Sequence, residues 1–163
     1  MCIRDSRYTD HITLKWPNDI YWRDRKISGT LIETTVKGKR IDRCVHGIGL
    51  NVNQREFCSN APNPVSLYNI IGRETPLEEM LDAVLRSFEL YYRRAVEGDR
   101  DGICAEYNAA LFRREGMHAY EDCATHERFE ARISRVALNG RLHLTDTQGL
   151  ERTYWMKEVR FIV

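Results

Sequence analysis

The stretch HITLKWPNDIYWRDRKISGTLIETT, residues 11–35, decides the fold of this chain. Residues 11–16 alternate apolar and polar side chains and then stop at Pro17-Asn18-Asp19, which is typical of a strand that ends in a turn. Residues 20–22 and 26–35 are also rich in β-forming side chains, and a short charged segment separates them. The pattern therefore predicts antiparallel strands joined by a hairpin whose charged tip lies in water.

One more strand is expected before the character of the chain changes. Residues 43–53 favour a strand that Gly47 and Gly49 loosen. Glycines inside a strand often mark a bulge or the close approach of a ligand. The segment 54–65 contains two prolines among polar residues, and we expect it to be a loop.

Two amphipathic helices are expected after this loop, because apolar side chains recur there every three or four residues. The first helix begins with Thr75 as the N-cap and Pro76 at the first helical position, and Glu78 completes a capping box. Gly98 ends this helix. The second helix spans about residues 101–114.

The last part of the chain, from residue 117 onward, contains short β-rich runs and no helix signal. Asn139-Gly140 lies between two such runs and predicts a hairpin with a two-residue turn. The whole pattern predicts an α+β chain in three parts. They are a non-native or disordered start (residues 1–10), a main domain with a mixed or antiparallel sheet and helices (residues 11–115), and a small C-terminal β-barrel (residues 116–163).

The composition is that of a chain that forms a core. It has 163 residues, of which 42% are hydrophobic and 30% charged, and its net charge of +1 lacks the excess of a strongly basic nucleic-acid binder. No run of 18 apolar residues is present, so no membrane partner is expected. The five cysteines form no CxxC pair, which favours scattered reduced thiols and a cytoplasmic location.

Two segments combine turn residues with reactive polar groups. Asn18 and Asp19 follow a strand end and could aim an amide and a carboxylate at one point, where Asp19 could hold Mg²⁺. The alternative is that both residues only cap a turn. Lys26 precedes Gly29 in the next strand and could pair with an anionic ligand that approaches the backbone, or it could simply be solvated.

A third segment, Gly47-Ile48-Gly49-Leu50-Asn51-Val52-Asn53, is weak evidence when it is taken alone. It has two of the glycines of a phosphate-binding loop. It lacks the third glycine of the dinucleotide pattern and the Gly-Lys-Ser/Thr of the P-loop. By itself it would indicate only amide side chains at the end of a strand.

Taken together, the three segments are much more specific. The series Lys15-Trp16-Pro17-Asn18-Asp19, Lys26-x-x-Gly29-x-Leu31-x-Glu33 and residues 47–53 resembles the central part of a biotin protein ligase (biotin–[acetyl-CoA-carboxylase] ligase). The following Asn63-Pro64-Val65-Ser66-Leu67, the helix pair and the β-rich end are also similar to that family. The resemblance implies a class II synthetase-like catalytic fold, of which residues 11–115 are a part, and a C-terminal barrel of the SH3-like type.

The resemblance also implies a two-step reaction and a set of roles. Biotin and ATP with Mg²⁺ form biotinyl-5'-AMP, and biotin then passes to a lysine of the biotin carboxyl carrier domain of a biotin-dependent carboxylase. A homodimer is a possible assembly, and a nucleic-acid partner is not implied. By position, the catalytic residue is Lys26, Gly29 adjoins biotin, and the residues near ATP or the adenylate are Lys15, Asn18, Asp19 (with Mg²⁺) and Asn51.

One departure from the family pattern matters. The family's Gly-Arg-Gly loop lies well upstream of the Lys-Trp-Pro-Asn-Asp motif, and residues 1–14 contain no such loop. We therefore expect a fragment with little or no activity alone, and we expect apolar residues such as Leu31 and Ile48 to be exposed. Two alternatives remain open: a module that binds nucleotide or carrier protein without catalysis, and a related lipoate-type acyl ligase.

Overall fold

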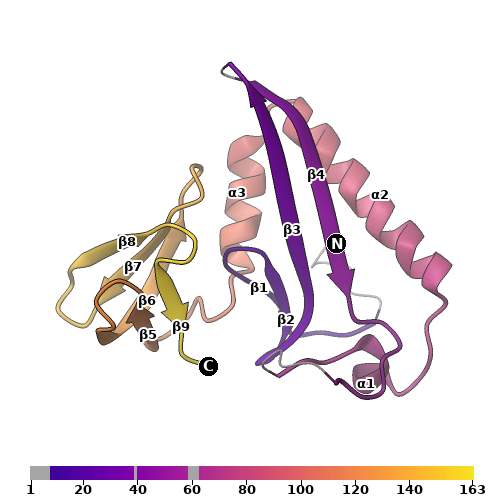
Figure 1. Ribbon diagram of the computed structural model, residues 1–163, viewed down its shortest axis with the longest axis horizontal. Coiled ribbons are helices and arrows are strands. Elements are labelled where there is room, and N and C mark those ends of the chain that lie inside the picture. Colours follow the sequence, from indigo (N-terminus) through magenta and orange to yellow (C-terminus); the bar gives the residue numbers. More distant parts are fainter. Residues whose placement is uncertain (1–7, 39, 59–62) are drawn as a thin grey trace.

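The computed structural model describes residues 8–38, 40–58 and 63–163, so most of the expected non-native start, Lys39 and part of the expected loop 54–65 lie outside the described residues. Nine strands and three helices are described in these ranges (Figure 1). In chain order they are β1 (Ile12–Lys15), β2 (Asp19–Trp22), β3 (Arg25–Lys37), β4 (Arg40–Leu50), α1 (Leu67–Ile71), α2 (Leu77–Val96), α3 (Arg100–Ala109), β5 (His118–Asp122), β6 (Arg128–Val136), β7 (Leu142–Asp146), β8 (Glu151–Tyr154) and β9 (Val159–Phe161).

The first sheet has the order β1-β2-β3-β4, and all of its neighbouring strands are antiparallel. The strands predicted from residues 11–53 are therefore confirmed, although β4 ends at Leu50 and residues 51–53 leave the sheet. The register sets Lys15 opposite Asp19, Asp19 opposite Gly29, and Gly29 opposite Gly49. Directly opposed residues share one face of a sheet, so this row crosses all four strands on one face.

A β-bulge interrupts the pairing of β2 with β3. Ile20 pairs with Ser28 but Tyr21 pairs with Lys26, so Ile27 is the extra residue and it is buried. A bulge re-aims the side chains on one side of it. Here it sets Lys26 opposite Tyr21, and Lys26 therefore lies on the same face as Asp19 and Gly29.

The helices differ from the sequence prediction at their starts. The predicted N-cap Thr75 is wrong: Pro76 is the N-cap of α2, and it makes no side-chain capping bond. Thr75 is instead tied to Asn53, whose amide side chain donates to the Thr75 carbonyl and accepts from the Thr75 N–H. The short α1 was not predicted, and Ser66 caps it in a capping box with Asn69.

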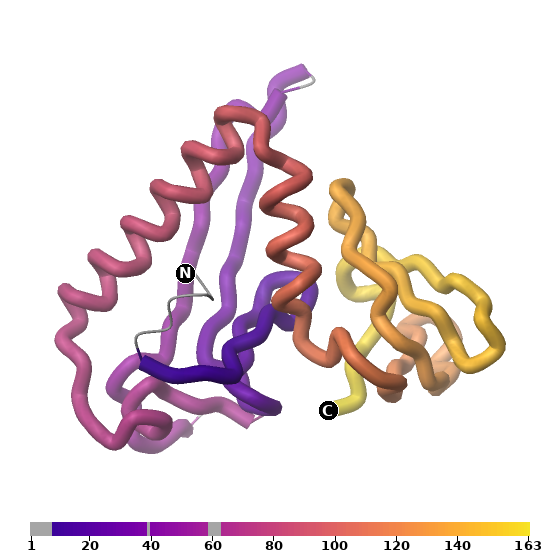
Figure 2. Tube along the Cα trace, turned by 180° about the vertical axis from the view of Figure 1, so that it is seen from behind, coloured from indigo at the N-terminus to yellow at the C-terminus, as the bar shows by residue number. Residues whose placement is uncertain are grey.

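The helix α3 is shorter than predicted and lies between the two sheets. It begins after Asp99, which accepts from the Gly102 N–H, and it ends at Ala109. Figure 1 and Figure 2 show α3 between the first sheet and the C-terminal strands, with α2 on the far side along β4. No described helix is long and apolar enough to cross a membrane.

The C-terminal sheet has five antiparallel strands in the order β8-β7-β6-β5-β9. Its β6–β7 turn was predicted as a two-residue turn at Asn139-Gly140, and this prediction is wrong. Ala137 and Arg141 pair across a three-residue loop, and Gly140 takes a φ of 87°. This geometry is a turn followed by a left-handed residue, for which glycine is favoured. Closure of this sheet into an SH3-like barrel stays a prediction.

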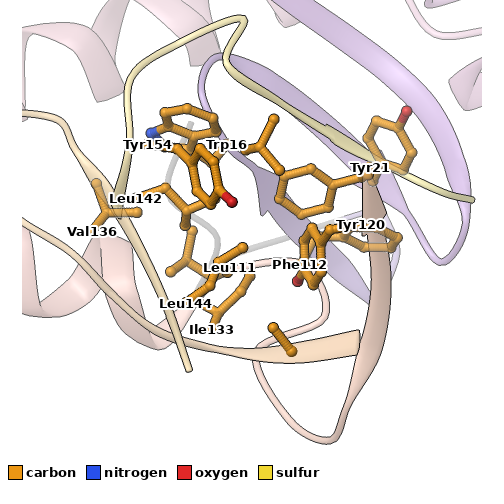
Figure 3. Packing of buried hydrophobic residues seen from close by; sticks show 13 residues of the cluster. Trp16, Tyr21, Leu111, Phe112, Tyr120, Ile133, Val136, Leu142, Leu144 and Tyr154 are labelled. Carbon is orange, nitrogen blue, oxygen red and sulfur yellow. The ribbon is translucent and has the colours of Figure 1, made fainter. Parts of the chain in front are cut away.

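One hydrophobic core joins the two predicted domains. Trp16 and Tyr21 from the first sheet pack with Leu111, Phe112 and side chains of the C-terminal sheet such as Tyr120 (Figure 3). The Trp16 indole also donates to the Gly140 carbonyl at 3.0 Å. Trp16 is therefore a core residue. These contacts hold the first sheet against the C-terminal sheet, and they begin at the residue that directly follows β1.

Candidate active site

The central feature of the site is an ion pair between β2 and β3. The Lys26 ammonium lies 2.6 Å from Asp19 Oδ1, and their side chains are 33% and 18% exposed. The turn after β1 places Asp19 at the first position of β2, and the bulge turns Lys26 onto the same face. The pair is half-buried, so solvent screens it only partly and both groups remain reachable by a ligand.

Gly29 allows the pair to lie close to the strand. A Cβ at this position would lie 3.0 Å from Asp19 Oδ1 and 3.1 Å from Lys26 Nζ. Both distances are shorter than ordinary van der Waals contact, so any side chain at residue 29 would displace the ion pair. The sequence prediction that Lys26 and Gly29 act at one place is consistent with this geometry.

The two asparagines of the predicted site make backbone contacts. The Asn18 side chain donates to the Thr30 carbonyl at 2.6 Å, and the Thr30 N–H donates to the Asn18 carbonyl. The Asn51 side chain donates to the Val65 carbonyl at 3.1 Å. Asn18 therefore extends the pairing of β2 with β3 next to the ion pair rather than capping its own turn, and Asn51 anchors a segment at the other side of Lys26.

That segment, Asn63–Pro64–Val65, was not singled out as part of a site from the sequence. The Lys26 N–H donates to the Asn63 carbonyl and the Val65 N–H donates to the Lys26 carbonyl, both at 2.9 Å. The Arg25 guanidinium donates to the Pro64 carbonyl at 2.8 Å. These bonds fix the backbone of Lys26 from the side opposite β2. The signal for this packing was the Asn-Pro pair, which marks a turn but does not say what the turn contacts.

Lys15 lies on the same face and is held by aromatic rings. Its ammonium is 5.4 Å from the centre of the Tyr21 ring and 4.9 Å from the centre of the Phe161 ring, which are cation–π distances. Burial lowers the pKa of Lys15, and the charges of Lys26 and Arg113 lower it further, while Asp19 opposes them. Lys15 is thus a half-buried cation whose charged form lacks full compensation.

Mg²⁺ fits this site only together with phosphate groups that supply further oxygen ligands. Asp19 is the acidic residue of the row, and one of its oxygens already accepts from Lys26. The described residues hold no group of three or more His, Cys, Asp or Glu side chains that could enclose a metal ion. Mg²⁺ commonly takes one carboxylate and completes its shell with waters and phosphate oxygens, and Asp19 could supply that one ligand.

The arrangement can bind an anion against a glycine-lined strand. Lys15 and Lys26 supply two ammonium groups on one face, and Gly29 and Gly49 leave the adjoining backbone without side chains. Cations held in a half-buried site stabilise negative charge that develops in a transition state. The geometry therefore suits a reaction in which a carboxylate or a phosphate gains charge next to Lys26.

Comparison with known proteins begins with a family model. The model of the biotin/lipoate A/B protein ligase family matches residues 5–51, which include β1, β2, β3 and β4. The match covers the Lys-Trp-Pro-Asn-Asp segment, Lys26 and Gly29. The part of the chain that carries the ion pair is therefore the part that matches this family.

Curated relatives are biotin ligases. The bifunctional ligase/repressor BirA of Escherichia coli is 44% identical over 54 residues, which are 33% of this chain and 17% of that protein. The biotin–[acetyl-CoA-carboxylase] ligase of Paracoccus denitrificans is 30% identical over 106 residues, 63% of this chain and 43% of that protein. Biotin–protein ligase 2 of Arabidopsis thaliana is 26% identical over 137 residues, 82% of this chain and 39% of that protein. The chain thus spans less than half of the length of these relatives.

Solved structures show the fold. The apo biotin protein ligase of Aquifex aeolicus superposes with a TM-score of 0.76 at 21% identity, over 98% of this chain and 69% of that one. The same ligase in complex with biotin and ATP also gives 0.76, at 22% identity. The expected biotin-ligase type of fold is confirmed, and so is the resemblance to biotin protein ligases that the sequence indicated.

Proposed function

We propose that this chain is the central and C-terminal part of a biotin protein ligase, which forms biotinyl-5'-AMP and transfers biotin to a lysine of a carrier protein. The observation that carries the proposal is the Lys26–Asp19 ion pair, which lies over Gly29, where a Cβ would crowd both charged groups. The names of the curated relatives and the family match over residues 5–51 support it.

In the first step, a biotin carboxylate oxygen attacks the α-phosphorus of ATP, and the bond from that phosphorus to pyrophosphate breaks. Lys26 lies at the junction of the biotin and phosphate sites. Its ammonium offsets the negative charge that builds up between the two anions. Asp19 holds Lys26 in place and supplies one ligand to Mg²⁺ that arrives with ATP.

In the second step, the amine of the carrier lysine attacks the carbonyl carbon of the mixed anhydride, and AMP leaves. The biotin moiety lies against the strand at Gly29. Lys15 adds positive potential near the phosphates, Asn18 shapes the turn beside them, and Asn51 lies near the adenine. The partner is a biotin carboxyl carrier domain. The free thiols of the four described cysteines support a cytoplasmic location.

The role of Lys26 is tested by Lys26→Met in a protein completed with the upstream third of a biotin protein ligase. The exchange of pyrophosphate into ATP, dependent on biotin, should fall by at least about 100-fold, because one preorganised charge is lost. Lys37→Met, at the far end of β3, is the matched control and should keep its rate. An unchanged rate in the Lys26 variant would remove Lys26 from the mechanism.

A lipoate-type acyl ligase is the second candidate, because the family model groups biotin and lipoate ligases. The completed protein is assayed with biotin and with lipoate side by side, and adenylate formation with biotin alone is expected. A module that only binds would instead bind a carrier domain in calorimetry without releasing pyrophosphate.

A further inference from the structure

The face of the first sheet that carries Lys15, Asp19 and Lys26 has more positive than negative charge. Lys15 and Lys26 come from the first sheet, and Arg113 comes from the segment between α3 and β5. Among the described residues, the Lys26–Asp19 pair is the ion pair of this group, and neither Lys15 nor Arg113 has a carboxylate oxygen within 4.0 Å. Two cations therefore remain without an anionic partner in the described chain.

The backbone places Arg113 directly beside β1. The Leu14 N–H donates to the Ala110 carbonyl and the Phe112 N–H donates to the Leu14 carbonyl, both at 2.8 Å. These bonds join the end of α3 to the strand that carries Lys15. Arg113 follows at once, with a φ of 56° in the left-handed region, so the chain turns sharply there.

Arg113 and Lys15 contact consecutive residues of the C-terminal segment. Arg113 Nη1 donates to the Ile162 carbonyl at 2.7 Å, and its guanidinium lies 5.2 Å from the centre of the Phe112 ring. The Lys15 ammonium lies 4.9 Å from the centre of the Phe161 ring. The two cations are thus held at one end of β9, and the positive charge of Arg113 contributes to the lowered pKa of Lys15.

This arrangement is costly without a ligand. Half-buried cations lose hydration, and they repel one another across a medium less polar than water. Asp19 offsets one of the three charges. An anion with at least two negative charges would compensate the other two, and phosphate chains supply this charge density. The planar guanidinium also offers several donors that match phosphate oxygens.

We propose that Arg113 completes, with Lys15 and Lys26, a subsite for the pyrophosphate portion of ATP. The subsite is built jointly by the first sheet and the segment that leads into the C-terminal sheet. This inference rests on the proposed function, since it assigns one more residue to the same site. Arg113 binds the leaving phosphates through its free donors while Nη1 stays on the Ile162 carbonyl.

The test is calorimetric titration of the whole 163-residue chain with inorganic pyrophosphate, with and without Mg²⁺. The variant is Arg113→Gln, because glutamine keeps a donor for the Ile162 carbonyl and removes the charge. Its affinity should fall by about tenfold or more, since a charge-assisted hydrogen bond is lost. Arg113→Lys restores the charge and should recover most of the affinity. The matched control is Arg114→Gln, whose side chain is half exposed at the next position and should bind as the parent does.

Binding is measured at low and high salt, and the unfolding midpoint of each variant is recorded first. A weaker salt dependence in Arg113→Gln than in the parent, with an unchanged midpoint, supports a direct charge contact rather than a structural role. If the glutamine variant does not fold, Arg113→Met, which also removes the charge, carries the test and must likewise bind pyrophosphate about tenfold more weakly than the parent. The inference is overturned if Arg113→Gln binds as tightly as the parent, if Arg114→Gln loses as much affinity, or if the parent chain does not bind pyrophosphate. The exchange assay with Lys26→Met judges the proposed function separately.

Discussion

At the scale of single residues, Gly29 decides how closely Lys26 and Asp19 can approach the strand. Its missing side chain leaves the space that the two charged groups fill, and a Cβ would lie about 3 Å from both. Neighbouring Gly47 differs, because a Cβ there would lie 3.8 Å from the nearest atom, which is ordinary contact. Both glycines lie inside a strand, but only at Gly29, of these two, would a Cβ crowd its neighbours.

Gly29→Ala should therefore impair the site more than the fold. The ends of two long side chains must shift by a few tenths of an ångström, which the fold tolerates at a cost of about 1 kcal/mol or less. The geometry of the ion pair changes, so we expect biotin-dependent exchange in the completed protein to fall about tenfold or more. Gly47→Ala is the control for the fold, and urea denaturation of both variants checks it. Equal exchange rates in Gly29→Ala and the parent would contradict the role of Gly29 in positioning the ion pair.

At the scale of elements, the Asn108 side chain binds α3 to the C-terminal sheet. The Asn108 side chain donates to the Val136 carbonyl at 2.9 Å and accepts from the Val136 N–H at 2.7 Å. It satisfies both backbone groups of Val136 at the end of β6. Tyr107, its neighbour on α3, donates to the Pro17 carbonyl at 3.4 Å, so the helix contacts the turn of the site as well.

Asn108→Ala should destabilise the chain by about 2–3 kcal/mol, because the two backbone groups of the buried Val136 lose their amide partner. Asn108→Asp keeps the acceptor for the Val136 N–H but places a carboxylate near the Val136 carbonyl. We therefore expect this variant to lower the free energy of unfolding as well. The measurement is the free energy of unfolding in urea. A cost below about 0.5 kcal/mol for the alanine variant would show that this junction does not hold α3 in place.

The amphipathic pattern of α2 predicted a helix, and the helix is present, but its apolar side is mostly not buried. Leu81 and Leu85 of that stripe remain more than half exposed, and Phe88 makes an edge contact with His46 of β4. Periodicity reports which residues share a helix face. It does not report whether another element covers that face.

At the scale of the whole molecule, buried tyrosines link stability to alkaline pH. Burial raises the pKa of Tyr120 and that of Tyr107 to about 12, while an unfolded tyrosine titrates near 10. Between these values the folded state holds protons that the unfolded state has lost, so stability falls as the pH rises. Lys15 acts in the opposite direction, because burial lowers its pKa in the folded state. The folded state loses this proton before the unfolded state does, so this group raises stability as the pH rises to about 10.4.

The net result should be a loss of stability between about pH 10 and pH 12, because the contribution of Lys15 ends at about pH 10.4, where an unfolded lysine titrates. Tyr120→Phe should flatten this loss, and it should cost little at pH 8 because the buried Tyr120 hydroxyl has no partner among the described residues. Urea denaturation at several pH values measures both effects. A pH profile of Tyr120→Phe that matches that of the parent would contradict the assignment.

Exposed apolar side chains on both faces of β3 and β4 predict association. Leu31 is 64% exposed, Val36 61% and Ile48 46%, in agreement with the expectation for Leu31 and Ile48. Long exposed apolar strands favour pairing with other chains. The 163-residue chain should therefore associate at micromolar concentration.

Light scattering on a size-exclusion column, over a series of concentrations, measures this association. Leu31→Lys with Val36→Lys should shift the chain toward the monomer. Leu138→Lys is the matched control, because Leu138 is 66% exposed in the β6–β7 loop, outside the first sheet. A parent chain that stays monomeric throughout the series would contradict the prediction.

The sequence by itself determined the strands of the first sheet, the order of the two long helices and the β-rich end. Alternation, helical periodicity and turn residues are local, and they act on the chain wherever it lies. The Lys-Trp-Pro-Asn-Asp motif, Lys26 and Gly29 pointed to one site only through their resemblance to biotin protein ligases. Thr75 and the Asn139-Gly140 turn were predicted wrongly, since a contact with Asn53 and an added loop residue decided them.

Only the tertiary structure decided the rest. The bulge at Ile27 turns Lys26 toward Asp19, and the end of α3 brings Arg113 beside the strand that carries Lys15. Arg113 is 98 residues from Lys15 along the chain, and no local pattern encodes that contact. Its physical cause is the shared core, in which Trp16 and Tyr21 pack with Leu111, Phe112 and the C-terminal sheet. Burial of apolar area selects which distant segments meet, and it thereby sets the charge balance of the site.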